Sequence, residues 1–164
     1  MVVLTSILLA VALIGPDRLI SDETQTIDTA YNIAEYGVSS SQRTEASAPA
    51  PDMRREPLYP FMVSLVLRAG DPSLDCLVDN APLDGCRAIR VAVRAVNAIL
   101  LAALVVMTYA SARLLLPTNW ALGAAAAVGL SPALLQYSNQ LLTEPLAALL
   151  LLSGSYGLCR AQSD

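Results

Sequence analysis

The sequence contains no histidine and no lysine, so all ten of its basic residues are arginine. Histidine is the side chain most used as a general base near neutral pH and is a common metal ligand, so acid–base chemistry here has to rest on carboxylates. The patterns of P-loop nucleotide binding, serine-hydrolase elbows, C-x-x-C pairs and zinc-protease helices are also missing. These absences argue against soluble nucleotide chemistry and against a hydrolase triad.

Charge of either sign is scarce: 15% of residues are charged and 55% are hydrophobic, whereas a typical soluble domain is about 25% charged. The net charge of −4 and the pI near 4.7 argue against nucleic acid as a partner. The few charges are also segregated, because 12 of the 14 acidic residues lie between Asp17 and Asp84. One polar block between apolar ends indicates a polytopic membrane protein with one large aqueous loop.

We therefore predict an all-α fold of about four transmembrane helices in a single membrane domain. The predicted segments are a first span at 1–16, an outer loop at 17–88, and further spans at 89–116, 120–136 and 144–160, which together fill residues 1–164. The first span is short for the roughly 20 residues that a membrane helix needs, and a signal peptide is the open alternative. Ser131-Pro132 is expected either to kink the third span or to end it.

Within the outer loop we expect two short helices. Ile27, Tyr31 and Ala34 recur at helical spacing, which predicts the first. Pro60 suits the first turn of the second, which runs to Leu67, is too short to span and is expected to lie at the membrane interface.

Two arginines predict how the chain is oriented in the membrane. Arg113 and Arg160 flank the ends that share one side of a four-span protein. The positive-inside rule places these ends in the cytoplasm and the large acidic loop outside, in a multi-pass protein of the inner or plasma membrane.

Asp22 and Glu23 follow the first apolar segment, at what we expect to be the water-facing mouth of the membrane domain. Adjacent carboxylates at a membrane surface are costly unless they are solvated, paired or used in chemistry. They could bind a divalent metal, or raise one another's pKa so that one acts as a general base. The alternative is a helix cap, in which Ser21 or Asp22 satisfies free N–H groups. Both interpretations stay open.

Two further pairs of polar residues belong to the predicted spans. Gln140 and Glu144, four residues apart, would contact a hydroxylated ligand, or Glu144 would simply favour a helix N-terminus. Arg94 and Asn97 lie inside the second span, where a polar pair needs a partner and a guanidinium group suits phosphate.

Cys76 and Cys86 are separated by nine residues in the outer loop. A disulfide between them is one interpretation if the loop lies outside the cytoplasm, and two free thiols are the other.

Several short motifs occur in a specific order between residues 19 and 152. They are Asp22-Glu23, Asp28 to Gly37, Glu56-Pro-Leu-Tyr59-Pro-Phe61, Arg94-x-x-Asn97, Ser131-Pro132 and Thr143-Glu144-Pro145. In this order the chain resembles the N-terminal part of the polytopic C-type glycosyltransferases, a group that includes the protein O-mannosyltransferases and bacterial aminoarabinose transferases.

The resemblance implies transfer of a sugar from a polyprenyl-phosphate-linked donor to an acceptor at the outer membrane face. It implies Asp22 as general base or metal-binding carboxylate, Glu23 as its neighbour, and a divalent metal as an open possibility. Arg94 would stabilise the negative charge that develops on the lipid phosphate as it leaves. The other substrate-binding candidates are Tyr59, Asn97, Gln140 and Glu144.

Enzymes of this group have many more spans than this chain, so we expect an incomplete N-terminal portion or a partner chain that supplies the missing spans. The expected partners are a lipid-phosphate-linked sugar and membrane lipids. The rival hypothesis is a non-catalytic assembly subunit or an inactive truncated remnant.

Overall fold

The computed structural model describes residues 21–42, 47–52, 56–70, 84–139 and 143–162. Every regular element among them is a helix, which confirms the all-α prediction for this part of the chain. In order along the sequence the helices are α2 (Ser21–Tyr36), α3 (Leu58–Gly70), α5 (Asp84–Leu115), α6 (Thr118–Gly129), α7 (Pro132–Asn139) and α8 (Glu144–Ala161).

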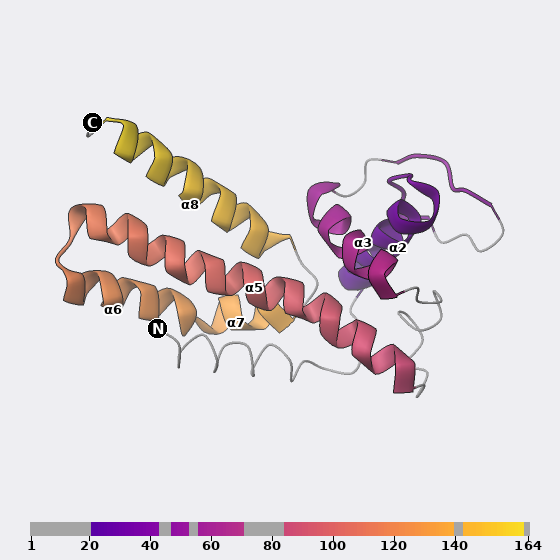
Figure 1. The fold of residues 1–164 in the computed structure, drawn as a ribbon, viewed down its shortest axis with the longest axis horizontal. Helices are drawn as coiled ribbons and strands as arrows, with labels where there is room; N and C mark the ends of the chain where they lie inside the picture. Colours follow the sequence, from indigo (N-terminus) through magenta and orange to yellow (C-terminus); the bar gives the residue numbers. More distant parts are fainter. Residues whose placement is uncertain (1–20, 43–46, 53–55, 71–83, 140–142, 163–164) are drawn as a thin grey trace.

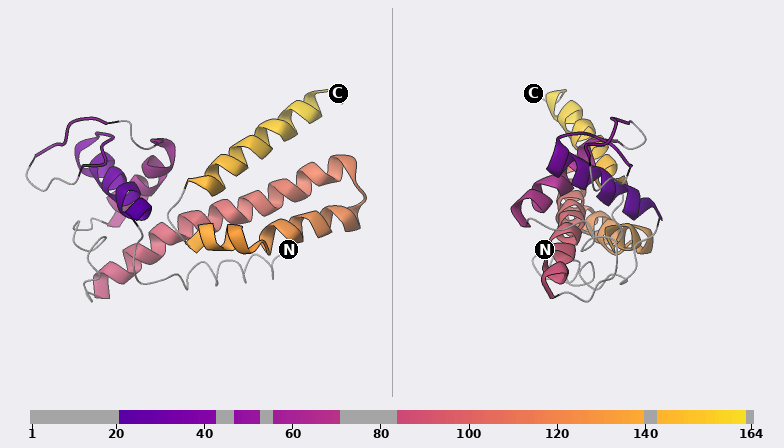
Figure 2. Two further views of the ribbon diagram at one scale, coloured as in Figure 1. Left: turned by 180° about the vertical axis from the view of Figure 1, so that it is seen from behind. Right: turned by 90° about the vertical axis from the view of Figure 1, so that its right-hand side faces the viewer.

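The long helix α5 organises the rest (Figure 1). It packs against α3 near one end and against α6, α7 and α8 along the remainder, while α2 packs on α3. Helices α6 and α7 run back along one side of α5 and α8 lies on another, and the views from behind and from the end agree (Figure 2). The α2–α3 pair therefore sits at one end of an elongated bundle.

One described helix, α5 over Val91–Leu115, is long and apolar enough to cross a membrane. The helix α8 has 18 residues but is too polar to meet the same test. The predicted third span at 120–136 is not continuous, because the chain leaves the helix at Leu130 and starts α7 at Pro132. Proline has no backbone N–H and restrains the residue before it, so Ser131-Pro132 ends one helix and begins the next. The predicted span at 1–16 lies outside the described residues.

Two apolar clusters hold the helices together. The larger joins α2, α3, α5 and α8, and its buried members are Ile27, Ala30, Tyr59, Val63, Leu67, Val93, Leu100 and Leu146. The smaller joins α5 and α6 through Leu101, Val105 and Ala125. Tyr31 and Ala34 pack against the larger cluster, so the helical spacing seen in the sequence does mark the core-facing side of α2.

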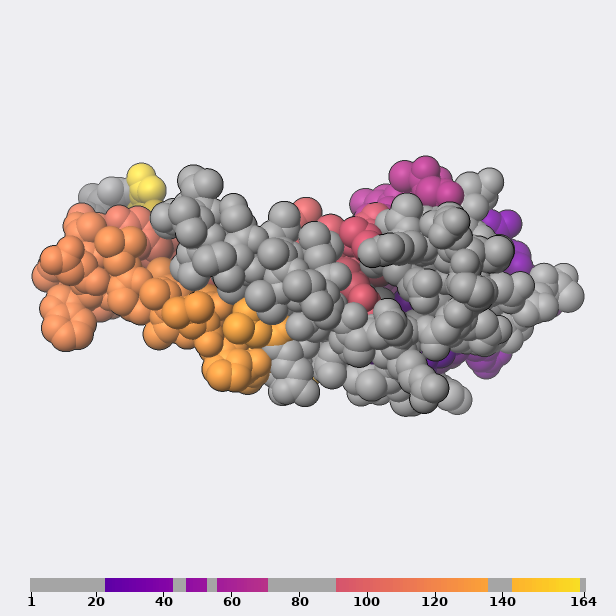
Figure 3. All heavy atoms as spheres, turned by 90° about the horizontal axis from the view of Figure 1, so that it is seen from below, coloured from indigo at the N-terminus to yellow at the C-terminus, as the bar shows by residue number. Residues whose placement is uncertain are grey.

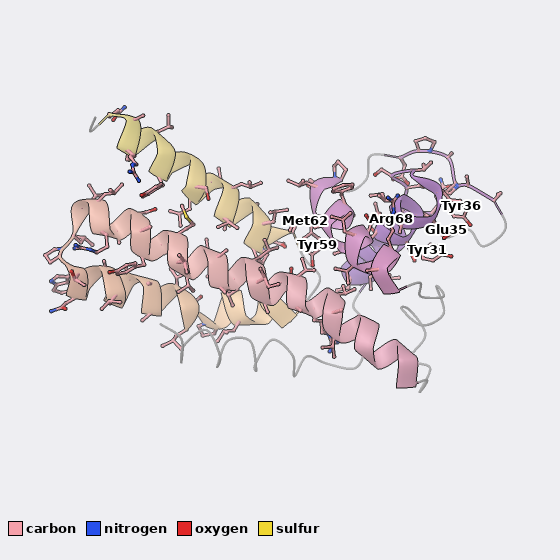
Figure 4. All side chains as sticks on the ribbon, viewed as in Figure 1. Tyr31, Glu35, Tyr36, Tyr59, Met62 and Arg68 are labelled. Atoms are coloured by element: carbon pink, nitrogen blue, oxygen red, sulfur yellow. The ribbon has the colours of Figure 1, made fainter. Side chains whose placement is uncertain are left out.

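The end of α2 is fixed to α3 by a side chain. Gly37 adopts a left-handed conformation, with φ of 69°, and its N–H donates to the Ile33 carbonyl at 3.1 Å. Arg68 of α3 donates from Nη2 to the same carbonyl at 3.0 Å and from Nε to Ala34 at 3.1 Å (Figure 4). Arg68 thus bonds two of the last carbonyls of α2 to the neighbouring helix, and at Ile33 its bond adds to the one from Gly37.

The chain after α2 is held by Asn32, which is buried. Its Nδ2 donates to the carbonyls of Ser40 and Gln42, each at 2.8 Å. Farther along, the N–H and hydroxyl of Ser41 both donate to Asp52 Oδ2, at 3.2 and 2.9 Å. These bonds fold the segment back on α2 and fix where the chain leaves toward α3.

We predict that Asn32→Asp destabilises the fold by about 1–3 kcal/mol, because a carboxylate cannot donate to the two loop carbonyls and would be buried with its charge. Denaturant unfolding in detergent, followed by circular dichroism, measures the change. Asn119→Asp, at an exposed position of α6, is the matched control. Equal loss of stability in both variants would contradict the stabilising role assigned to the hydrogen bonds of Asn32.

Candidate functional site

Three buried polar side chains lie where α2, α3 and α5 meet, and we call Glu23, Tyr59 and Asn97 the buried polar cluster. Their exposed fractions are 1%, 0% and 0%. Each shares a helix face with core residues, since Glu23 precedes Ile27 by one turn and Asn97 lies one turn beyond Val93. Helical periodicity therefore forces these polar groups into the interior together with the apolar residues around them.

The phenol of Tyr59 is the centre of the cluster. Burial raises the pKa of Tyr59 well above its ordinary value of 10, the negative charge of Glu23 raises it further, and the Asn97 side chain lowers it by a smaller amount. The phenol therefore keeps its proton at physiological pH. It can act as a hydrogen-bond donor, and it cannot act as a base.

The Tyr59 hydroxyl forms no hydrogen bond of normal geometry with the part of the chain that the structure describes. Asn97 lies near enough to influence its pKa, but the contact does not reach the geometry of a formed bond. A buried hydroxyl without a partner costs about 1–3 kcal/mol, and such groups in folded proteins call for a functional or structural explanation.

A cavity of about 210 Å³ adjoins Tyr59. It lies between the start of α3 and the start of α8, and its walls are Glu56, Leu58, Tyr59, Thr143, Leu146, Ala147 and Leu150. Tyr59 is thus both a wall of this cavity and a neighbour of Glu23 in the interior. Figure 4 shows Tyr59 and Met62 on the side of α3 that faces the bundle.

The expectation that Glu23 faces water is wrong. Its 1% exposure places it in the interior, because it stands on the face of α2 that packs on α3. The side chain of Asp22 lies outside the described residues, so its roles as base, metal ligand or cap stay predictions. No group of three or more Cys, Asp or Glu side chains gathers within the described ranges, and a metal at Asp22-Glu23 also stays a prediction.

The other predicted residues are spread over the structure. Arg94 is half-buried on α5, one turn before Asn97, and Glu144 is exposed at the first residue of α8, beside the cavity wall at Thr143. Gln140 and Cys76 lie outside the described residues. The side chain of Cys86, in the first turn of α5, lies outside them too, so the disulfide is untested. The structure brings together Glu23, Tyr59 and Asn97, and it places Glu144 only near their cavity.

Sequence reasoning missed several buried polar residues of α2 and α3. The hydroxyls of Thr29 and Ser64 donate hydrogen bonds within their own helices, Thr29 to the carbonyl of Gln25 at 2.8 Å and Ser64 to the carbonyl of Phe61 at 2.7 Å. Thr26 and Asp28 are also buried. Thr26 and Asp28 are the sequence neighbours of Ile27. Their position beside Ile27 could have revealed their burial, because the face of α2 toward α3 is wider than its apolar stripe. These residues make α2 a helix with an unusually polar interior face.

No protein-family model matches this chain, and no curated protein and no solved structure matches it either.

We predict that Tyr59→Phe keeps or raises stability at pH 7, because it removes a hydroxyl with no formed bond. The difference in favour of Tyr59→Phe grows in alkali. Because the folded-state pKa of Tyr59 lies above the unfolded value, the protonated phenol contributes stability below pH 10, and this contribution is lost as pH rises toward the folded-state pKa.

The free energy of unfolding of the unmodified protein should therefore fall more steeply above pH 10 than that of Tyr59→Phe, with a difference in slope of up to about 1.4 kcal/mol per pH unit. Denaturant unfolding at a series of pH values measures both slopes. The other tyrosines are common to both proteins and cancel in the comparison. Parallel curves would show that the phenol is not held in a desolvated site.

Proposed function

We propose that this chain forms the acceptor-side part of a multi-pass membrane glycosyltransferase that uses a polyprenyl-phosphate-linked sugar. The observation that carries the proposal is the buried polar cluster: a carboxylate, a protonated phenol and an amide from three helices, beside a cavity at one end of a membrane-length helix. The order of motifs that resembles the C-type glycosyltransferases passes through all three residues.

The proposed reaction assigns a role to each group. A carboxylate of the Asp22-Glu23 pair takes the proton of the acceptor hydroxyl, whose oxygen attacks the anomeric carbon of the sugar. The bond from that carbon to the lipid phosphate breaks, and the phosphate leaves with the electron pair. Tyr59 donates a hydrogen bond and Asn97 orients the phenol, while Arg94 is the candidate for the developing phosphate charge.

A low-dielectric setting supports catalysis by a buried carboxylate, because it strengthens every charge interaction within it, so a proton acceptor in this position acts strongly on a bound hydroxyl. The cavity beside it has an almost entirely apolar surface, with Glu56 and Thr143 among the residues of its wall. Tyr59 connects this cavity to Glu23, and a ligand in the cavity would reach the carboxylate past the phenol.

The membrane placement belongs to the same proposal. We place α5, the α6–α7 pair and α8 across the bilayer, with α3 at the interface. Large apolar side chains exposed on these helices support it, and they include Ile99, Leu115, Trp120, Leu151 and Leu158. Figure 3 shows α6 and α7 forming the surface at one end of the molecule, as expected of helices that face lipid.

We predict that Glu23→Gln lowers sugar transfer by about 10²–10⁴-fold, the usual contribution of a general base. The assay uses membranes from cells whose chromosomal gene carries the change, supplied in turn with radiolabelled polyprenyl-phosphate-linked hexose or pentose. Asp22→Asn is assayed in parallel, since either carboxylate of the pair can hold the proton. Glu35→Gln, on the exposed side of the same helix, is the matched control and should keep full transfer. Full transfer by both carboxylate variants would remove the catalytic assignment.

The second candidate function is a non-catalytic assembly subunit. The exposed apolar sides of α5, α6 and α8 favour it, because a partner chain could cover them. The same assay separates the two functions. An assembly subunit predicts that deletion of the gene abolishes transfer while Glu23→Gln and Asp22→Asn do not.

A further inference from the structure

The cavity beside Tyr59 opens onto an apolar surface. Two of its wall residues, Leu58 at the start of α3 and Leu150 on α8, are 50% and 53% exposed. Phe61 and Leu65 continue the row from Leu58 along α3 at helical spacing, and both are exposed as well. In the membrane placement proposed above this row and the outer side of α8 face the bilayer, so the cavity opens toward hydrocarbon.

The interior of the cavity matches a hydrocarbon chain. Leu146, Ala147 and Leu150 of α8 lie opposite Leu58 of α3, and the cavity surface is almost entirely apolar. A sugar ring or a peptide placed there would lose its hydrogen bonds to water without replacing them, which is unfavourable. The cavity, of about 210 Å³, is also smaller than the roughly 300–1,000 Å³ of a site that encloses a whole small molecule. It suits a ligand of which one segment enters while the remainder stays in the bilayer.

Two polar groups beside the cavity ask for different partners. The buried Tyr59 hydroxyl keeps its proton and makes no hydrogen bond of normal geometry within the described ranges, so it can donate to a ligand oxygen. The nearby carboxylate of Glu23 can only accept. A carboxylate accepts several hydrogen bonds, so Glu23 can take one from a ligand in addition to the interactions that it already has. A hydroxyl both accepts and donates, whereas an ester or ether oxygen only accepts.

We propose that the cavity beside Tyr59 binds a long-chain alcohol of the membrane, and that this lipid is the acceptor of the sugar. Its chain lies between Leu58 and Leu150, and its hydroxyl accepts a hydrogen bond from Tyr59. The hydroxyl proton passes to Glu23 as the oxygen bonds to the anomeric carbon, and the phosphate of the donor leaves with the electron pair of the broken bond. The inference rests on the proposed function, because it takes the buried carboxylate as the base.

The lipid-phosphate donor fits this cavity less well. Its phosphate group needs cationic partners in an apolar setting. The described residues of the wall include no arginine, and the charged side chain among them is the acidic Glu56. Arg94, the candidate for the phosphate charge, belongs to α5, which contributes none of these wall residues. The wall therefore favours a neutral lipid.

Photolabelling of the whole chain in phosphatidylcholine nanodiscs tests the proposal. The probes are a hexadecanol that carries a diazirine and the matching hydrocarbon without the hydroxyl. We expect the alcohol to label the first turns of α3 and α8 in a saturable way, and to bind more tightly than the hydrocarbon. Leu150→Trp fills the cavity and should abolish this labelling, whereas Leu151→Trp, at an exposed neighbour that is not a wall residue, is the matched control and should keep it. Equal labelling of the two variants would overturn the site.

Tyr59→Phe separates recognition of the hydroxyl from packing of the chain. It should weaken binding of the alcohol roughly two- to tenfold, the effect of one hydrogen bond, and leave binding of the hydrocarbon unchanged. An equal effect on both probes would refute the contact between Tyr59 and the ligand hydroxyl. Circular dichroism checks that each variant keeps its helices.

Unlabelled polyprenyl phosphate identifies the source of the chain. It should not compete with the alcohol probe, and competition would assign the cavity to the donor and overturn the acceptor proposal. Photolabelling requires neither donor nor turnover, so the two proposals fail in different ways. Selective labelling together with full transfer by Glu23→Gln and Asp22→Asn would refute the transfer reaction and support the lipid site alone. Loss of transfer in these variants without saturable labelling would refute the lipid site and support the reaction.

Discussion

The burial of Tyr59 is the constraint on which the N-terminal part of the structure depends. Its ring belongs to the apolar cluster that joins α2, α3, α5 and α8, so it lies in the core that these four helices share. Its hydroxyl is carried into the same interior, next to the charge of Glu23. Apolar packing provides the driving force, and the polar cluster is held in place by it.

Much of this fold follows from the sequence because it rests on local patterns. Periodicity marks the inner face of α2, Pro60 marks the start of α3, and Ser131-Pro132 marks the break between α6 and α7. The depth of Glu23 does not follow, because charge alone predicts a solvated side chain and the packing of α2 on α3 overrides it. The sequence predicts Tyr59 as a site residue only through the resemblance, since nothing about a tyrosine in an apolar helix distinguishes a core residue from a functional one.

The cavity beside Tyr59 was not predictable for a different reason. It is formed by helices far apart in the sequence, and its volume depends on the angle at which they cross. Asn97 and Arg113 lie sixteen positions apart on α5, which is about 24 Å along a helix. In the proposed membrane placement the buried polar cluster and Arg113 then lie near opposite sides of a hydrocarbon layer about 30 Å thick.

The bonds from Arg68 to the end of α2 have a mechanical consequence. Because the side chain of one helix closes the terminus of the other, α2 and α3 cannot slide past each other without breaking both bonds. Any rotation of this pair against α5 would carry the carboxylate and the phenol together as one rigid body. Only the amide on α5 would be left behind, so such a rotation would change its distances to the carboxylate and to the phenol and preserve the distance between those two groups.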